Sequence, residues 1–196
     1  MASHAEGGGE WDKNKKDFIY TVAEGIKSHA EGVRTTAKGT GSHAEGYKTV
    51  AEGIYSHAEG ISTLAVGNHS HVEGADGVAF GNNSHVEGWN CSTAQGAGAS
   101  HAGGEASQAE AYGAFAHGAY LRATEKYQTV FGKGNIANSN ALFIIGNAEL
   151  DDDDRVTVPS NAFEVLQNGS IIIGGVELTP AKLEKLIKFI DSIEEY

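Results

Sequence analysis

A seven-residue phrase repeats ten times without interruption between Thr21 and Asn90, in the pattern small-x-Ala/Val-x-Gly-x-x. Every second phrase carries the core Ser-His-Ala/Val-Glu-Gly, so the full repeat is fourteen residues long and occurs five times. A period this short and regular is typical of repeat proteins, in which similar units stack and each unit contacts only its neighbours. The repeat therefore predicts a solenoid.

A seven-residue period also suggests a coiled coil, but the residue types exclude one. A coiled-coil seam needs large apolar side chains at two positions. Glycine would fill one of them in every repeat, at a cost of about 1 kcal/mol relative to alanine. As a strand, segment 28–32 places Ser, Ala and Gly on one face and His and Glu on the other. The glycine then takes the corner, where a positive φ suits it. Two strands and two turns make one coil of a parallel β-roll.

The inward-facing residues of this β-roll are only Ser, Thr, Ala, Val and Gly, so its two sheets are expected to lie close together. A thin interior buries little apolar area, at about 25 cal/mol per Å². The opposing cost of ordering the chain is about 1–2 kcal/mol per residue. We therefore expect the roll to complete its core by association between chains.

The repeat resembles the YadA-like head of trimeric adhesins, and its SHAEG version is similar to repeats in tail-fibre and neck-appendage proteins of phages and prophages. Residues 127–147 followed by 160–175 are similar to the segment that closes the repeat region in those appendages. The resemblance covers about residues 21–175 and implies an all-β fold, a left-handed parallel β-roll assembled as a homotrimer. The chain departs from the adhesin pattern because His and Glu stand where adhesin repeats favour Val and Ile. We recognise no membrane-anchor barrel, virion-attachment domain or self-cleaving chaperone domain.

Charge and composition narrow the range of partners. The net charge of −12 makes nucleic acid a poor partner, because the chain would repel a phosphate backbone. The single cysteine, Cys91, cannot form an intrachain disulfide, which is consistent with assembly in a cytoplasm. No apolar run reaches the roughly 18–20 residues of a membrane-spanning helix, and residues 1–20 lack the hydrophobic stretch of a secretion signal. We expect no membrane insertion and no cofactor.

Four segments follow from these patterns: an N-terminal coil and loop (1–20), β-roll repeats (21–111), degenerate repeats with a closing β unit (112–176) and a C-terminal trimerising helix (177–196). Residues 3–7 already read SHAEG, so the roll is expected to begin there. The surplus residues, 8–18, are interpreted as a binding loop or as a plug over the open end of the solenoid. After Asn90 the repeat slips by one residue twice, at 92–96 and 100–104.

The chain beyond the repeats becomes richer in aromatic residues, which predicts a wider terminal unit with its own small core that covers the last strand edges. Asp151–Asp154 is expected to be a solvated turn, because it lacks the glycine and the spacing of a calcium loop. Residues 160–175 alternate as two strands around the turn at Gln167, Asn168 and Gly169.

The C-terminus predicts a short α-helix. Thr179 is a suitable N-cap, Pro180 suits the first helical position, and Leu178 can pack on Leu183. Apolar residues then share one side of the helix: Leu183, Leu186, Ile187, Ile190 and Ile193. A helix of about 16 residues is barely stable alone, so we expect a three-helix bundle with copies of itself. Packing back against the end of the roll is the alternative.

Two ladders of ionisable side chains follow from the fourteen-residue period. The imidazoles of His29, His43, His57, His71 and His85 should stack about 4.8 Å apart. The carboxylates of Glu31, Glu45, Glu59, Glu73 and Glu87 run beside them. Stacked carboxylates repel one another, and neighbouring imidazoles relieve that repulsion. We place this face in the trimer interface, with a solvated outer sheet as the alternative. Trimer stability should then vary between about pH 5 and 7.5, with a sign that the sequence leaves open.

The chain offers little for metal binding or catalysis. His69 and His71 form a His-x-His motif that resembles metal-binding motifs of phage tail tips, but His69 falls at a turn position, so we assign no metal site. Glutamates of the ladder satisfy the spacing of a glycosidase pair, yet a thin roll has no cleft between them. No Ser-His-Asp order or phosphate loop is recognisable. We therefore expect no enzymatic activity and no catalytic residue.

The turn that follows each SHAEG segment starts with a mostly apolar column: Val33, Tyr47, Ile61, Ala75 and Trp89. This column is expected to pack against the next subunit, or alternatively to expose Tyr47 and Trp89 for stacking on sugars. Trp11, in the N-terminal loop, is a third candidate for receptor contact.

We expect a non-enzymatic, trimeric fibre or appendage segment that recognises or adheres to a host surface. It would be made in the host cytoplasm and carried on a virion or phage-derived particle. A host cell-surface glycan or receptor, and other virion proteins, would be its partners. The alternatives are a structural spacer or capsid-surface fibre without a specific receptor, and a glycan-degrading spike.

Overall fold

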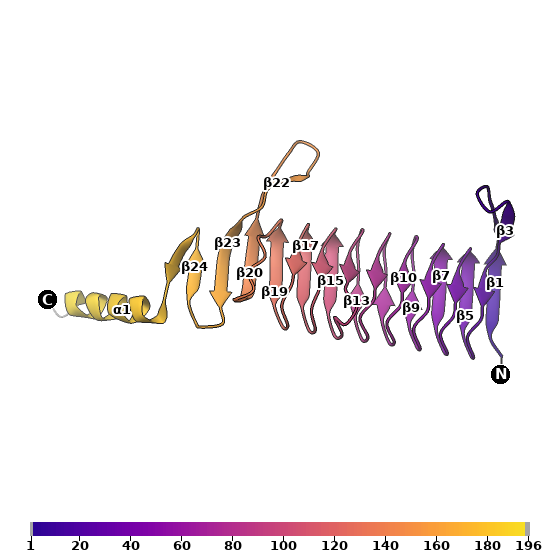
Figure 1. The fold of residues 1–196 in the computed structure, drawn as a ribbon, viewed down its shortest axis with the longest axis horizontal. Coiled ribbons are helices and arrows are strands. Elements are labelled where there is room, and N and C mark those ends of the chain that lie inside the picture. The colour runs from indigo at the N-terminus through magenta and orange to yellow at the C-terminus, as the bar shows by residue number, and fades with distance from the viewer. Residues whose placement is uncertain (1, 195–196) are drawn as a thin grey trace.

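The computed structural model describes residues 2–194, which form a long stack of β-coils followed by one helix (Figure 1). The fold is an all-β solenoid of about 9 coils of roughly fourteen residues, as the repeat predicts. Within the described residues, no helix is long and apolar enough to cross a membrane.

Two sheets run along the stack. The 13-stranded sheet contains, in spatial order, β1 (His4–Gly8), β5 (His29–Val33), β7 (His43–Tyr47), β9 (His57–Ala58), β11 (His71–Val72), β13 (His85–Val86), β15 (His101–Glu105), β17 (Phe115–Ala119), β19 (Thr129–Lys133), β20 (Ala141–Asn147), β23 (Asn161–Leu166), β24 (Ile171–Ile173) and β25 (Val176–Leu178). The 8-stranded sheet contains β4 (Val22–Ala23), β6 (Thr36–Ala37), β8 (Val50–Ala51), β10 (Leu64–Ala65), β12 (Val78–Ala79), β14 (Ser92–Thr93), β16 (Gln108–Ala109) and β18 (Arg122–Ala123). Neighbouring coils pair in parallel, with His29 opposite His43 and Ala30 opposite Ala44.

The predicted alternation of SHAEG is confirmed. Ser28 and Ala30 are buried in the interior, whereas His29 and Glu31 lie on the outer face and are partly exposed. The inward serine is satisfied locally, because the Ser28 hydroxyl donates a hydrogen bond to the carbonyl of Gly25 at 2.7 Å. The SHAEG register also begins at the N-terminus, where His4 pairs with His29.

The glycine of the intervening phrase has a different role from the one we expected. The SHAEG glycine adopts a positive φ, as at Gly32 with φ of 108°. In the other phrase the positive φ falls two residues after the glycine, as at Tyr55 with φ of 54°. Gly53 is needed there because a Cβ atom would overlap the carbonyl of Gly67 in the next coil. Close packing of coils, rather than φ, selects this glycine.

The core is one continuous column of small side chains, and the separate terminal core that we expected is absent from the described residues. It runs from Ala30 through the repeats to Leu121 and Ile144, which widen the same column. Gln128 takes a buried inward position, and its side-chain amide donates hydrogen bonds to the carbonyls of Asn138 and Ala141 at 2.9 and 2.7 Å.

The repeat slips once, by two residues, instead of twice by one. Val78 pairs with Ser92, fourteen residues on, whereas His85 pairs with His101, sixteen residues on. The two extra residues therefore lie in the turn between β14 and β15. A turn can absorb an insertion that a strand pair cannot, because a one-residue shift within a strand would reverse its buried face.

The sheet changes from parallel to antiparallel after β20, which pairs with β23. The hairpin predicted at 160–175 is confirmed, since β23 pairs with β24 across a turn with Gly169 at φ of 82°. β21 (Glu149–Leu150) and β22 (Val156–Val158) form a hairpin that projects from the stack (Figure 1). Its tip is a solvated acidic turn, in which Asp151 and Asp153 pair with Arg155 at 3.0 and 2.6 Å.

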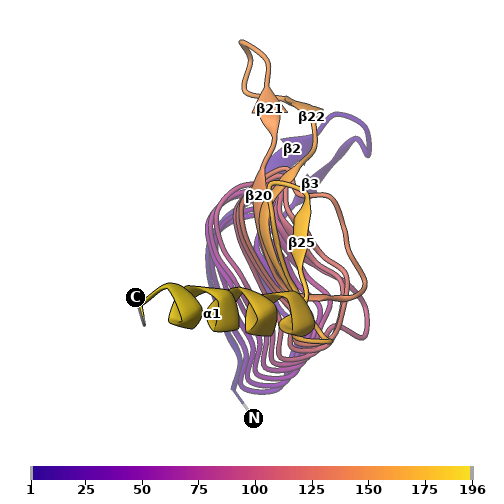
Figure 2. The ribbon, with the colours of Figure 1, turned by 90° about the vertical axis from the view of Figure 1, so that its left-hand side faces the viewer.

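The predicted helix is α1 (Pro180–Glu194), and it extends from the last strand away from the roll (Figures 1 and 2). The Thr179 hydroxyl accepts a hydrogen bond from the backbone N–H of Lys182 at 3.3 Å, which confirms the N-cap. At the other end, residues 8–18 form most of a hairpin, β2 (Glu10–Asp12) and β3 (Asp17–Ile19). The hairpin projects from one edge of the coils instead of plugging the open end (Figures 1 and 2).

Candidate functional site

The histidine ladder forms with the predicted spacing. The ring centroids of His29, His43, His57 and His71 are 4.8, 4.7 and 4.8 Å apart, and successive rings are parallel within 7°. Strand spacing in a sheet sets this distance. His85 continues the stack at 5.0 Å, whereas the ring of His101 is turned by 74° relative to that of His85.

The glutamate ladder lies within ion-pair distance of the imidazoles. His71 Nε2 is 3.2 Å from Glu59 Oε1, and His85 Nε2 is 3.3 Å from Glu73 Oε1. The pKa of His57 is lowered, first by burial and then by the neighbouring His71 and His43, against the opposing effect of Glu59 and Glu45. His57, in the middle of the ladder, therefore favours the neutral imidazole. His71 and His85 hydrogen-bond to these carboxylates, whereas the buried Nε2 atoms of His29, His43 and His57 have no hydrogen-bond partner.

The face that carries the ladders becomes apolar toward the C-terminus. In the column of the glutamates, sheet register places Phe131 beside Ile145, Ile145 beside Phe163, Phe163 beside Ile173, and Ile173 beside Val176. Phe131, Ile145, Ile173 and Val176 are 39, 38, 52 and 64% exposed. We call this column the apolar stripe. It ends at β25, directly before the helix.

Helix α1 adds further exposed apolar side chains. Leu186, Ile187, Ile190 and Ile193 are each about half exposed, and Leu183 is half-buried. Phe189, which the sequence reasoning omitted, is 63% exposed on the same helix. The alternative of a helix packed back on the roll is not found in the chain that the structure describes, because α1 points away from the coils (Figure 1).

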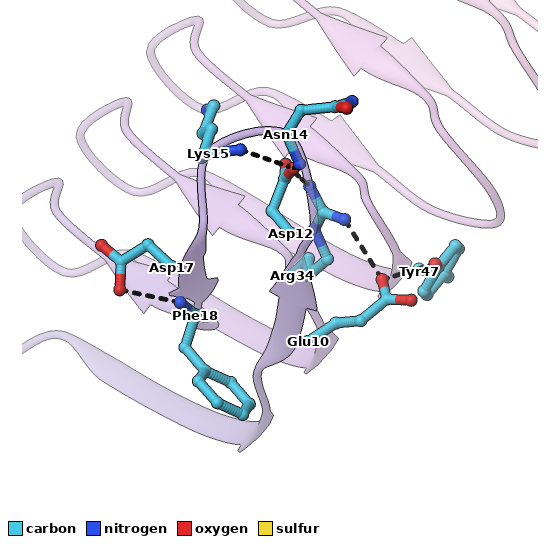
Figure 3. A network of polar contacts seen from close by, with 8 residues as sticks. All are labelled: Glu10, Asp12, Asn14, Lys15, Asp17, Phe18, Arg34 and Tyr47. Carbon is cyan, nitrogen blue, oxygen red and sulfur yellow. Dashed lines mark hydrogen bonds and ion pairs between the residues drawn. The ribbon is translucent and has the colours of Figure 1, made fainter.

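The N-terminal hairpin is fastened to the edge of the roll by a polar network (Figure 3). The Arg34 guanidinium donates to Glu10 and to Asp12, both at 3.2 Å, and the Tyr47 hydroxyl donates to Glu10 at 2.6 Å. These contacts lower the pKa of Glu10, with Tyr47 the largest cause and Arg34 the second. Backbone N–H groups of Lys15 and Asn14 lower the pKa of Asp12. The hairpin is thereby held in one orientation.

The hairpin exposes three aromatic rings, which we call the aromatic cluster: Trp11, Phe18 and Tyr20. Trp11 packs edge-on against Phe18 with centroids 5.5 Å apart, and Phe18 stacks on Tyr20 at 5.9 Å. Their exposures are 48, 48 and 61%. Trp11 was identified from the sequence, whereas Phe18 and Tyr20 were not, because Phe18 is placed beside Trp11 by the hairpin register and Tyr20 stacks on Phe18.

The column of turn residues forms in register: Tyr47 pairs with Ile61, Ile61 with Ala75, and Ala75 with Trp89. Its two aromatic members differ in their surroundings. Trp89 is 51% exposed and is free to offer a ring face. Tyr47 is only partly exposed, its hydroxyl holds Glu10, and Lys48 Nζ lies 4.6 Å from its ring centroid. Tyr47 therefore anchors the hairpin.

The structure does not bring His69 and His71 together. His69 lies in a turn with φ of 56° and stacks on Tyr55, with centroids 5.8 Å apart. His71 lies in β11, the strand that follows this turn, and belongs to the ladder. Over residues 2–194, the clusters of possible metal ligands all lie along the ladders and none contains His69.

No family model matches the chain, and no curated protein matches it either.

Proposed function

We propose that this protein is a non-enzymatic, trimeric fibre or appendage segment that binds a host surface through its N-terminal hairpin. The observation that carries the proposal is the aromatic cluster on a braced hairpin. Aromatic faces suit sugars and other flat apolar surfaces. Rigid presentation lowers the ordering cost of binding, and Arg34 and Tyr47 supply that rigidity. A host cell-surface glycan or receptor is the proposed ligand.

Association of three chains, as a left-handed β-roll, is the second part of the proposal. The apolar stripe ends at β25, and α1, with its own exposed apolar side chains, follows β25 directly in the chain. Exposed apolar surface of this kind marks a site of association. We assign copies of the same chain as its partners, because a three-helix bundle would cover α1 and the stripe together. The ladder face, which continues the stripe toward the N-terminus, then lies between chains.

Binding of purified protein to host cells and to a glycan array tests the proposal. Trp11→Ala and Phe18→Ala should each weaken saturable binding at least about 10-fold if the ring is central to the contact. Tyr55→Ala is the matched control, because Tyr55 is an exposed aromatic on the roll. Trp89→Ala tests the turn column as the contact instead.

Arg34→Ala tests the orientation of the hairpin separately from the aromatic rings that would contact the ligand. It removes both ion pairs of the hairpin and leaves the aromatic cluster intact. Binding should weaken while the melting temperature of the roll stays close to that of the native protein. Release of oligosaccharide would establish the glycan-degrading alternative. Absence of binding to every host surface would favour the spacer and refute the proposal.

A further inference from the structure

The regular glutamate ladder ends at β15. The segment 100–104 reads SHAGG, so Gly103 stands where the repeat has glutamate. The missing side chain leaves room that two neighbours occupy. A Cβ atom on Gly103 would lie 2.5 Å from His117 Nδ1 and 3.0 Å from Glu87 Oε1. His117 comes from β17 and Glu87 follows β13, so three adjacent coils converge there.

The three side chains at the gap approach one another evenly. His101 Nε2 lies 3.4 Å from His117 Nδ1 and 3.5 Å from Glu87 Oε1, and His117 Nδ1 lies 3.4 Å from the same oxygen. Zinc binds nitrogen and oxygen ligands at about 2.0–2.2 Å in a tetrahedron, whose edges are then about 3.3–3.6 Å long. All three separations fall in that range. The triangle therefore matches one face of a zinc coordination sphere.

The regular part of the ladder also gathers possible ligands within 4.8 Å, as at His57, Glu59 and His71, but its imidazoles are held one strand spacing apart. There the rings of His43 and His57 are stacked 4.7 Å apart and parallel within 4°, so they lie one above the other. His101 and His117 have ring centroids 5.7 Å apart, yet their nearest nitrogens point close together. The irregular coil thus brings two imidazoles onto one carboxylate oxygen.

The surroundings of the triangle suit a metal site with an open position. Phe115 stacks on the His101 ring at 4.6 Å and fixes its orientation. The side chains of His101, Glu87 and His117 are 22, 33 and 44% exposed in the single chain, so the triangle has an open side for a fourth ligand.

We propose that Glu87, His101 and His117 bind one divalent transition-metal ion, best matched by Zn²⁺, in each chain. Two imidazoles and a carboxylate with an open position are a ligand set that zinc commonly accepts in proteins. The site joins three successive coils where the two-residue insertion interrupts the repeat. Its occupancy is expected to stabilise the roll at that irregularity, since a ligand that binds only the folded state raises its stability.

The test is titration of untagged, chelator-treated protein with Zn²⁺ by calorimetry, together with thermal denaturation. Native protein should bind about one zinc ion per chain and melt at a higher temperature when zinc is present. Addition of Co²⁺ should give the visible absorption bands of a tetrahedral complex. His101→Phe and His117→Ala should each weaken zinc binding by more than the roughly 10–100-fold that loss of an outer-shell partner costs.

His57→Phe is the matched control for His101→Phe, because both remove one imidazole from the same column. The column itself already accepts phenylalanine, since Phe115 pairs with His101. Zinc affinity should be unchanged in His57→Phe. The proposal is overturned if native protein binds no zinc at micromolar concentration. It is also overturned if His57→Phe and His101→Phe lose binding equally, which would indicate diffuse binding along the ladder.

Discussion

At the residue scale, two constraints select the SHAEG glycines: a positive φ and the close approach of the next coil. Substitutions can separate them. Gly60 has φ of 99°, and a Cβ atom there would overlap the carbonyl oxygen of Gly74 in the next coil. Gly96 has φ of 85°, but a Cβ atom there would meet nothing within 4 Å. A side chain at either position would be strained by the positive φ. Only at Gly60 would its Cβ atom also collide with the backbone of the next coil.

Gly60→Ala should therefore destabilise the protein much more than Gly96→Ala. Backbone strain alone costs about 1–3 kcal/mol, which is the loss of unfolding free energy that we expect for Gly96→Ala. Gly60→Ala should cost more than that, because two coils must move apart. Thermal denaturation followed by circular dichroism measures both. Equal melting temperatures for the two variants would show that the close spacing of the coils adds nothing to the cost of the Gly60→Ala substitution.

His57 predicts the sign of the pH dependence, which the sequence left open. Burial, then His71 and His43, hold the pKa of His57 below its ordinary value of 6.5. Below pH 6.5 the unfolded chain therefore binds more protons at this residue than the folded chain does. The contribution of His57 to stability is complete above that pH and is lost as the pH falls toward the folded pKa. The melting temperature should decrease from pH 7.5 to pH 5.

His57→Phe should reduce this slope, because it removes one imidazole whose protonation opposes folding. The matched control is His4→Phe, at the exposed end of the same column. The two variants should be compared at pH 7.5 and pH 5 in the presence of a chelator. A slope in His57→Phe as steep as that of the native protein would assign the pH dependence to other groups.

At the element scale, the sequence predicted the elements that are determined by residues close together in the chain. The strand faces, the hairpin around Gly169 and the helix capped by Thr179 all depend on residues within a few positions. The hairpin anchor was missed because Arg34 and Glu10 are distant in sequence and meet only through coil stacking. His101 and His117 were missed as a pair for the same reason. Their contact depends on the register of three strands and on a side chain absent at Gly103.

Helix α1 provides a prediction at this scale. Leu186→Asp with Ile190→Asp places two charges in the apolar side of the helix and should prevent assembly, because unpaired charges are costly to bury. Ala181→Asp with Ser192→Asp adds the same charge on the opposite side of the helix and should leave assembly unchanged. Light scattering gives the mass of each variant. A native particle with the mass of one chain, or assembly unaffected by the first pair, would contradict the role of α1.

Across the whole molecule, one sheet face changes character from end to end. It is polar and titratable along the His/Glu ladders, and from Phe115 to Val176 it is lined mainly by aromatic and aliphatic side chains. The sequence showed the first part because the repeat is strict there. The apolar part could not be predicted from the sequence, because in degenerate repeats only the strand register shows which residues share a face. The aromatic cluster lies at the opposite end of the chain from α1 (Figure 1).

Three identical chains joined in parallel through α1 would present three aromatic clusters at one end of the rod, which predicts avidity. Several weak sites on one particle can gain roughly 10²–10⁴ in apparent affinity without any new contact. The native protein should therefore bind a receptor-dense host surface far more tightly than the Leu186→Asp/Ile190→Asp variant does. The Ala181→Asp/Ser192→Asp variant should keep the native affinity. On a surface with sparse receptors the difference should vanish, because only one hairpin can then engage. Equal binding by native protein and the Leu186→Asp/Ile190→Asp variant on dense surfaces would show that a single hairpin suffices and that assembly serves another purpose.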